Sequence, residues 1–523
     1  MFLKFQLTLP IKIFITATLS LILFFGIKTK IISPQFQLLL SIPLLFLVRS
    51  DIFSKDNIFS SLGIITLFLY GFFLVFFPQH FLDNSPTFFD LLAFITTIIL
   101  VGKFFENTLR KKTEIIIEKL AGVFPVKVTV LKKGKTKTTS IKNLQKGDLV
   151  LCSQGKIIPV DGHIKSGFGY VDESIFFGLS SHQQKQKGDF VFAGTKNLLG
   201  TFVLKISQTG PEAIIQKILK NINYSQMTPE NLKLKSTPYF IFVILIFVLF
   251  SFLLWYLFFG QPLHYAILTV VAILLIANSH AFKLAISTPL FTAQCFGVQN
   301  GIFFKEPQSL RIFPKTKTFF FKENGTLTLK QPKTNDLIPK KNTQKVIDFF
   351  LKKNKRLILL SNNNQSSLRL FAKILKIKEV LFNLTPLQIA ERIKKIKSQN
   401  PKTIITFVSQ SKKDTLPLKT ADLSLNSVID QNFSKSPTQI FLIKNDILLL
   451  PHSYKIAQKT AHIINQNLTF ILLYHLFCLF LAAGFLSPFG IKIQPIFAAT
   501  LGSLSSIFLI LNSFRIKSLK LNF

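Results

Sequence analysis

Long apolar runs alternate with polar segments along this chain, and the alternation predicts most of its architecture. Eight runs are apolar enough to be membrane helices, which need about 20 such residues. They cover residues 11–28, 33–49, 58–78, 86–105, 237–259, 264–289, 465–485 and 491–512. The pattern predicts a polytopic α-helical membrane protein of about eight spans, arranged as four, then two, then two.

Two polar segments separate these groups of spans. Residues 113–232 alternate like strands and carry turn signals such as QKGD and VDGH, which predicts a β-rich domain. Residues 303–460 alternate short apolar strands such as RLILL and TIITFV with helical patterns, which predicts a parallel α/β domain. The membrane segments are then 1–112, 233–302 and 461–523.

Basic residues set the expected orientation. A basic block follows Lys103 and includes Arg110, Lys111 and Lys112. Such blocks stay on the cytoplasmic side, so we expect the N-terminus and both polar domains to be cytoplasmic, in a bacterial plasma membrane. The first apolar run resembles a signal peptide, but more spans follow it at once, so a retained span is expected.

Composition narrows the classes of partner. The hydrophobic fraction is 49% and the formal net charge is +39, which admits nucleic acid or an anionic membrane as a partner. The basic residues are mostly Lys, are spread over the polar segments, and accompany 59 Phe and many Ile and Asn, as A/T-rich codon usage would produce. We therefore expect the bilayer and not nucleic acid. Three scattered Cys predict neither disulfides nor a cysteine zinc site.

The first polar segment carries an ordered series of motif residues. It matches the pattern G-D, P-G-x-x-I-P-V-D-G, D-E-S, T-G-E-S, G-D, G-T-x-N-x-x-G, and so resembles the actuator domain of P-type cation ATPases. The matches are Gly147, Asp148, Pro159, Asp161, Gly162, Asp172, Glu173, Ser174, Gly188, Asp189, Gly194, Thr195, Asn197 and Gly200. The last two spans, with INQNL and LAAG, resemble those of the heavy-metal subclass, as does the four-two-two layout.

The sequence KENGTLT, residues 322–328, resembles the family's phosphorylation loop D-K-T-G-T-L-T. The resemblance implies that residues 303–460 form a HAD-like phosphorylation domain. Lys322 stands where the family has the aspartate that accepts phosphate, while Thr326 is retained. An amine cannot form an acyl phosphate, so the loop is predicted to be inactive.

The other catalytic positions implied by the resemblance are also altered. The T-G-D aspartate aligns with Asn363, and the first aspartate of G-D-G-x-N-D, a magnesium ligand, aligns with Gln410, whereas Asp414 is retained. The P-x-x-K lysine aligns with Ile389. In the actuator motif T-G-E-S, Gly178 is retained, but the glutamate that positions water is Leu179, which cannot act as a base.

A nucleotide domain has no room in this chain. Fewer than 30 residues separate Thr328 from the strand at Arg356, including a polar linker at 331–342, whereas a folded domain needs at least about 50. The family uses ATP and Mg2+, but with both sites altered no cofactor is expected here.

The transport site implied by the resemblance is altered as well. The C-P-C motif of heavy-metal pumps aligns with His280, Ala281 and Phe282, and the seventh span carries His475 and Cys478. These two His and one Cys are the candidate metal ligands within the bilayer, because ionisable residues there are often functional. The alternative is that each is a polar residue satisfied by helix packing. No metal-binding domain is expected before the first span.

These observations predict a pseudoenzyme with a P-type ATPase fold that acts as a partner or regulator of another membrane protein. One alternative is an ATP-independent metal transporter or binder that uses His280 and His475. Another is a former heavy-metal pump in decay. A basic nucleic-acid-binding protein is the remaining alternative.

Overall fold

The computed structural model describes most of the chain. The described residues are 8–29, 31–53, 57–78, 86–121, 127–132, 135–173, 182–208, 237–277, 279–328, 338–361, 365–411, 413–426, 436–443, 446–487 and 494–521. Contacts divide the chain into two compact units, one of which comprises 1–112, 228–289 and 463–514 and holds the apolar helices.

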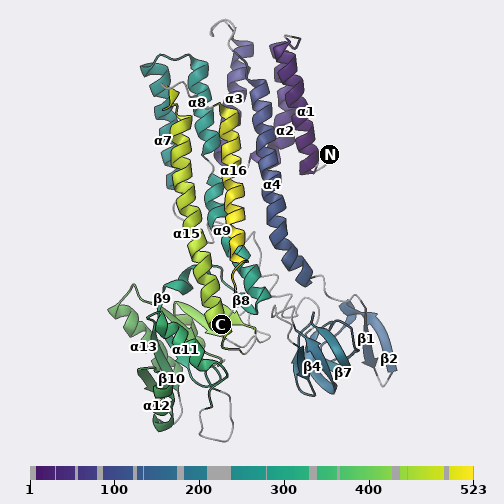
Figure 1. Cartoon of the computed structure of the whole chain (residues 1–523). Coiled ribbons are helices and arrows are strands. Elements are labelled where there is room, and N and C mark those ends of the chain that lie inside the picture. The colour runs from purple at the N-terminus through teal and green to yellow at the C-terminus, as the bar shows by residue number, and fades with distance from the viewer. Residues whose placement is uncertain are drawn as a thin grey trace. The chain divides into compact units, whose positions relative to one another are not determined.

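The apolar runs form helices that lie side by side (Figure 1). The helices are α1 Leu9–Lys28, α2 Pro34–Ile52, α3 Ile58–Phe76, α4 Phe89–Ala121, α7 Thr237–Leu253, α8 Leu263–Ile276, α9 Ser279–Gln299, α15 Leu449–Ala482 and α16 Pro495–Ser513. Among the described residues, seven helical segments are long and apolar enough to cross a membrane, with α8 and α9 counted as one. The fourth predicted span corresponds to the first part of α4, which is not among the seven.

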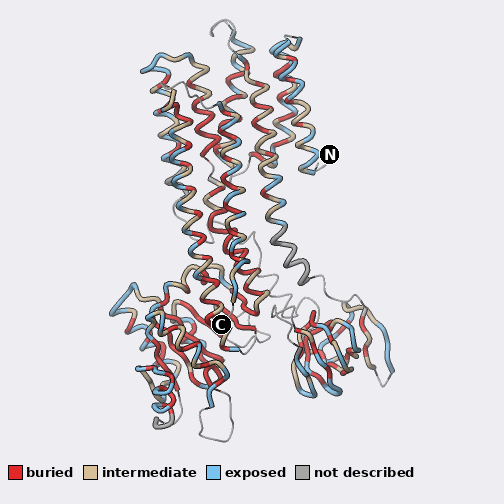
Figure 2. The backbone as a smooth tube through the Cα atoms, in the orientation of Figure 1, coloured by how far each residue is buried: buried red, intermediate tan, exposed pale blue. Residues whose placement is uncertain are grey.

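The outward faces of the bundle are apolar. Figure 2 shows exposed positions along its periphery and buried ones between the helices. Phe14, Phe242 and Phe477 are each at least 65% exposed, whereas Leu44, Leu92 and other aliphatic side chains are fully buried inside. Exposed apolar surface on this scale suits a lipid environment. The chain is a polytopic helical membrane protein.

The sixth predicted span, 264–289, differs from the observed helices. α8 ends at Ile276, the following residue Ala277 has a ψ of 72° outside the helical region, and α9 runs from Ser279 to Gln299. The apolar residues of the sequence continue across this break, so the pattern did not predict it. The break has tertiary support, because a Cβ on Gly502 of α16 would lie 2.6 Å from the carbonyl oxygen of Leu275. Only glycine admits so close an approach of two backbones.

The segment 127–208 forms an antiparallel sheet. Its strands are β1 Lys127–Lys132, β2 Lys135–Ser140, β3 Leu149–Cys152, β4 Asp161–Asp172, β5 His182–Lys185, β6 Phe190–Val191 and β7 Lys196–Gln208. The order is β2-β1-β3-β7-β4-β5, and β6 also pairs with β4. Alternate side chains such as Val150, Ile164 and Leu204 face one buried core, as the period of two predicts.

The segment 302–442 forms a mostly parallel sheet flanked by helices. Its strands are β8 Ile302–Phe304, β9 Thr316–Lys322, β10 Arg356–Ser361, β11 Glu379–Phe382, β12 Ile404–Val408, β13 Leu423–Asn426 and β14 Ile440–Leu442. The helices between them are α11 Thr343–Lys352, α12 Gln365–Ile374, α13 Pro386–Gln399 and α14 Thr415–Thr420. The order is β11-β10-β9-β12-β13-β14-β8, and only β8 is antiparallel. β9 lies between β10 and β12, and its Phe319, Phe320 and Phe321 are fully buried.

Candidate functional site

The chain reverses its strand order at β9. From β9 it moves outward to β10 and β11 on one side, and then returns to β12 on the other. Parallel α/β sheets bind ligands at the carboxyl ends of the strands at such a point. Lys322 ends β9, and Ser409 and Gln410 directly follow β12. The fold therefore places residues 322–328, which resemble a phosphorylation loop, at the position where parallel α/β sheets bind ligands.

Lys322 forms an ion pair with Asp414 at this point. Its Nζ lies 2.8 Å from Asp414 Oδ1, and Asp414 is fully buried while the Lys322 side chain is 14% exposed. Ser409 Oγ donates a hydrogen bond of 2.6 Å to the other carboxylate oxygen. A buried carboxylate needs a compensating charge, and here a lysine supplies it. The charge of Asp414 is thus neutralised by Lys322.

Glu323 anchors the turn that follows. Its side chain is 1% exposed, Ser361 Oγ donates to its Oε2 at 2.8 Å, and Thr328 Oγ1 donates to its Oε1. Its carbonyl oxygen accepts hydrogen bonds from the backbone N–H groups of Thr326 and Leu327. Glu323 therefore organises the GTLT turn and is already engaged by protein donors.

A second lysine, Lys340, closes the loop from the other side. It is 8% exposed and its Nζ donates to the carbonyl oxygen of Gly325, which has a φ of +75°. Lys340, Thr326 and Gln410 line one small pocket. The Thr326 hydroxyl is buried and has no hydrogen-bond partner among the described residues. Lys340 was missed by the sequence analysis because it falls in the segment interpreted as a polar linker.

Of the remaining predicted catalytic positions, Ile389 is among the described residues. Ile389 is 2% exposed and packs with Phe320 and Ile358 in the core, where a phosphate-binding lysine would stand in the family. Asn363, Gly178 and Leu179 lie outside the described residues. No group of three His, Cys, Asp or Glu side chains that could hold a metal ion occurs in the described part of the chain.

Several residues of the actuator motif stabilise the antiparallel sheet. Asp161 Oδ1 accepts from the N–H of Ala193 at 2.8 Å, and buried Asn197 donates to the carbonyl oxygens of Cys152 and Gly200. Gly147 and Gly188 have φ values of +97° and +95° in tight turns, each next to an aspartate that caps its turn. These motif positions stabilise the turns and the core of the sheet.

The candidate metal ligands in the membrane unit lie in separate surroundings. His280 Nε2 is 2.9 Å from Glu106 Oε1 on α4, and its Nδ1 has no hydrogen-bond partner among the described residues. His475 is 2% exposed, its Nδ1 is hydrogen-bonded to the carbonyl oxygen of Ile471, and its ring stacks on Phe282 with ring centroids 5.8 Å apart.

Cys478 is also buried, at 2% exposure, within the apolar core of the bundle. The three candidates therefore do not form a ligand group, and the structure adds Glu106 instead. Glu106 was missed because it directly follows the predicted fourth span.

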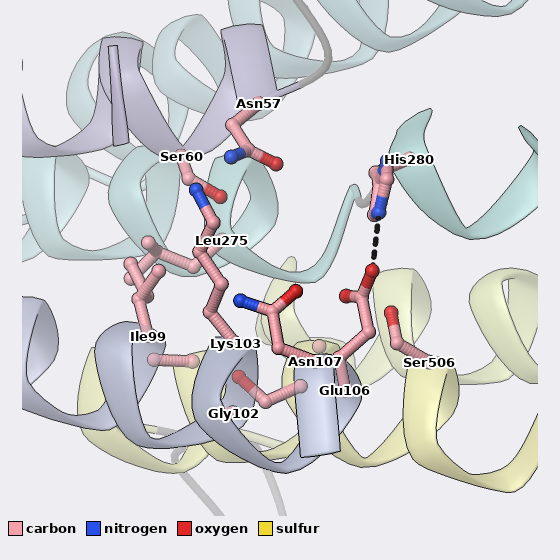
Figure 3. Close-up of a pocket in the computed structure, with 13 residues that line it drawn as sticks. Asn57, Ser60, Ile99, Gly102, Lys103, Glu106, Asn107, Leu275, His280 and Ser506 are labelled. Atoms are coloured by element: carbon pink, nitrogen blue, oxygen red, sulfur yellow. Dashed lines mark hydrogen bonds and ion pairs between the residues drawn. The ribbon is translucent and has the colours of Figure 1, made fainter. Parts of the chain in front are cut away.

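The His280–Glu106 pair borders a polar pocket of about 350 Å³. Figure 3 shows Lys103, Asn107 and Ser506 facing the same space. The pocket is lined from α3, α4, α8, α9 and α16, so it lies inside the helix bundle. This pocket, with a carboxylate, an imidazole and several amide and hydroxyl groups, differs from the apolar helices around it, and polar groups among such helices are candidate functional sites.

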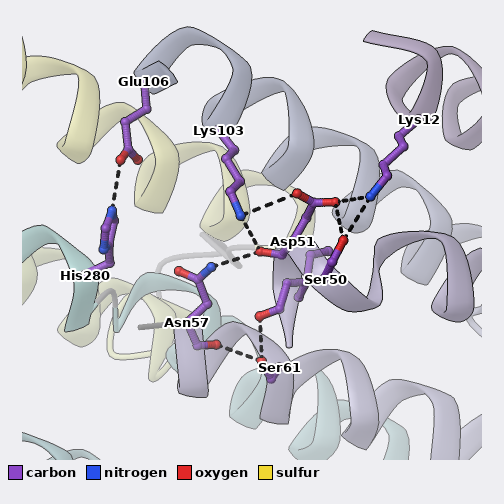
Figure 4. A network of polar contacts seen from close by, with 9 residues as sticks. Lys12, Ser50, Asp51, Asn57, Ser61, Lys103, Glu106 and His280 are labelled. Atoms are coloured by element: carbon purple, nitrogen blue, oxygen red, sulfur yellow. Dashed lines mark hydrogen bonds and ion pairs between the residues drawn. The ribbon is translucent and has the colours of Figure 1, made fainter. Parts of the chain in front are cut away.

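A polar network lies beside the pocket (Figure 4). Asp51 pairs with Lys12 at 2.5 Å and with Lys103 at 3.6 Å. Lys103 Nζ and Asn57 Nδ2 also donate to the Asp51 carbonyl oxygen. These contacts join α1, α2, α4 and the start of α3, and they fix one wall of the pocket.

Comparisons with known proteins agree with this arrangement. Residues 122–223 match the model of the P-type ATPase actuator domain. The chain is similar to the "Probable copper-exporting P-type ATPase" of Archaeoglobus fulgidus, with 23% identity over 92% of this chain and 75% of that protein. It is also similar to the "Probable copper-transporting ATPase PacS" of Synechococcus elongatus, with 28% identity over 60% of this chain but only 44% of that protein.

A solved structure of a zinc-transporting PIB-type ATPase in the E2.Pi state matches 98% of this chain and all of that one, with a TM-score of 0.50 and 16% identity. That likeness concerns the fold. The helix bundle and the actuator-type sheet give the chain the fold of a P-type ATPase. Within that class, its listed relatives are copper-transporting P-type ATPases, to which the chain is similar.

Proposed function

We propose that this chain is a catalytically inactive member of the heavy-metal P-type ATPase family that acts as a partner or regulator of another membrane protein. The proposal depends mainly on the Lys322–Asp414 ion pair. The lysine ammonium occupies the place beside the carboxylate where a P-type pump binds Mg2+. We assign the parallel sheet to a HAD-like phosphorylation domain that keeps its fold and lacks its chemistry.

Electrostatics and hydrogen bonding support the proposal. Both carboxylates at the strand ends, Asp414 and Glu323, are buried and engaged by Lys322, Ser409, Ser361 and Thr328. A Mg2+ ion would have to displace a lysine from a fully buried carboxylate. Phosphoryl transfer depends on metal and donors placed in advance, so a site closed by its own side chains cannot perform it.

The test is ATP turnover by the purified full-length chain. The chain in detergent, supplied with Mg2+ and with Cu(I) or Zn2+, should show neither vanadate-sensitive turnover nor an acid-stable phosphoenzyme. An active heavy-metal P-type ATPase, prepared in parallel, is the control for detergent and lipid. Metal-stimulated, vanadate-sensitive turnover would refute the proposal. Purification in mild detergent with mass spectrometry should then recover a stoichiometric membrane partner, whereas a lone chain without metal favours a protein in decay.

We propose the plasma membrane as its location, with both soluble domains in the cytoplasm. The support is the basic block that follows Lys103 at the end of the fourth predicted span. Cysteine-labelling of a tagged N-terminus in intact cells tests the orientation, and labelling by a membrane-impermeant reagent would contradict it.

The His280–Glu106 pair favours a second candidate function, metal binding or transport without ATP. An imidazole and a carboxylate that face one pocket are suitable ligands for a borderline metal ion. Metal uptake into proteoliposomes should then be lost on His280→Ala and retained on His475→Gln, because His475 is hydrogen-bonded to backbone. Equal uptake by all three proteins would exclude a role of the His280–Glu106 pair in transport, and no uptake above that of empty liposomes would exclude transport.

A further inference from the structure

An open groove of about 590 Å³ lies at the end of the parallel sheet, between α12 and β11. β11 is the last strand of the sheet in the described part of the chain, and it pairs with β10 on one side only. Figure 1 places α12 at this end of the sheet. The apolar lining includes Val380 and Phe382, which share one face of β11 and are only half-buried.

The rim of the groove is basic. It consists of Arg369, Lys373, Lys376 and Lys378. None of these four forms an ion pair with a described residue. The nearby acid Glu379 is already held by Arg356 through two hydrogen bonds of 2.6 and 2.7 Å. Four positive charges around one groove thus remain without an acidic counterpart there.

The surface beside the rim is also apolar. Leu370 and Ile374 lie one helical turn apart on α12 and are 66% and 63% exposed. The Arg369 guanidinium lies 5.8 Å from the centre of the Phe382 ring, which places its charge over the groove. Two large aliphatic side chains next to each other are unfavourable on a helix face that only water contacts. Together with the charge of Arg369 they indicate a contact surface.

We propose that this groove binds an extended acidic segment of a partner protein, which adds a strand to β11. Alternate side chains of the segment would cover Val380 and Phe382, and its carboxylates would meet the rim cations. Edge strands offer unpaired backbone donors and acceptors for such pairing. This inference specifies the partner chemistry of the proposed function and rests on that function.

Charge complementarity favours an acidic segment of a partner protein over a second copy of this chain. A second copy of the chain, with a formal net charge of +39, would bring more cations to the groove. Lysines at a sheet edge also discourage pairing between identical chains. A segment in which acidic and aliphatic residues alternate satisfies both the charge of the rim and the apolar floor.

The probe is a dye-labelled octapeptide of alternating glutamate and valine, titrated into the full-length chain in detergent at physiological salt. Fluorescence anisotropy should report saturable binding. Lys373→Glu/Lys378→Glu should weaken it about tenfold, because two attractive pairs become repulsive. The matched control is Lys394→Glu/Lys395→Glu, which makes the same charge change at exposed positions of α13 outside the groove and should alter affinity less than twofold.

Hydrogen exchange tests the binding geometry. The amides of residues 379–382 should gain protection when the peptide binds, and a peptide with proline in place of two valines should give neither protection nor tight binding. Equal weakening by both double variants would overturn the proposal in favour of general attraction to a basic protein. Groove-dependent binding of inorganic polyphosphate in place of the peptide, or no binding at all, would also overturn it.

The same preparation separates this proposal from the proposed function. A chain that turns over ATP and still binds the peptide refutes the pseudoenzyme and keeps the groove. A chain that is inert toward ATP and does not bind the peptide refutes the groove alone.

Discussion

Replacing Lys322 with alanine should destabilise the α/β domain strongly. The substitution leaves Asp414, which is fully buried, with Ser409 as its remaining side-chain partner. Removal of one member of a buried ion pair typically costs 3–5 kcal/mol, because the other charge stays desolvated. The Lys322 side chain is 14% exposed, so water can reach the vacated space, and we expect the lower end of the range, about 3 kcal/mol.

A heat challenge followed by brief proteolysis measures this loss in the full-length chain, with an antibody against the α/β domain as the readout. In a domain of about 150–250 residues each kcal/mol lowers the midpoint by about 2–4 °C, so Lys322→Ala should lower it by about 6–12 °C. Lys345→Ala removes an exposed lysine of α11 and should shift it by less than about 2 °C.

The double variant Lys322→Ala/Asp414→Ala decides whether the cost comes from the unpaired charge. Removing both charges should recover a large part of the lost stability, because no desolvated carboxylate remains. A single variant with an unchanged midpoint would refute the account of Lys322 as a built-in counter-ion. The account would also be refuted if the double variant lost as much stability, relative to the unsubstituted chain, as the two single variants lose together.

Three further predictions follow from the same structure. Lys322→Asp should not restore ATP turnover, but Mg2+ at millimolar concentration should raise the unfolding midpoint of this variant and leave that of the unsubstituted chain unchanged, since two carboxylates then face each other. Burial raises the pKa of the Cys152 thiol from 9.0 to about 12, so this thiol in the native protein should resist maleimide at pH 8. Between about pH 9 and 12 the unfolded thiol ionises and the folded one does not, so the free energy of unfolding should fall as pH rises through that window. Cys152→Ala should remove this pH-dependent component. Asn467→Leu should lower bundle stability by about 1–2 kcal/mol, seen as aggregation in detergent at lower temperature, because Asn467 donates to the Ala285 carbonyl oxygen and accepts from Asn512, whereas Leu473→Ala on an exposed face should have little effect.

The sequence determined the architecture of this protein. Local periodicity predicts the apolar runs of membrane length, the strand alternation in 127–208 and the short buried strands around Phe319–Phe321. This periodicity does not depend on which residues occupy the catalytic positions. The sequence also predicts that residue 322 cannot form an acyl phosphate, because a lysine amine has no carboxylate oxygen to phosphorylate.

Only the tertiary structure decided what the altered residues do. The sequence could not place Lys322 against Asp414, 92 positions away, or reveal that Glu323 holds Ser361 and Thr328. These contacts arise because parallel strands bring their carboxyl ends together across the sheet.

In the membrane unit the sequence suggested three candidate ligands, His280, His475 and Cys478. Packing separated them, because His475 is hydrogen-bonded to backbone and Cys478 lies in the core, while His280 meets Glu106 from another helix. The direction in which a helical side chain points depends on the rotation and neighbours of its helix, and an apolar run fixes neither.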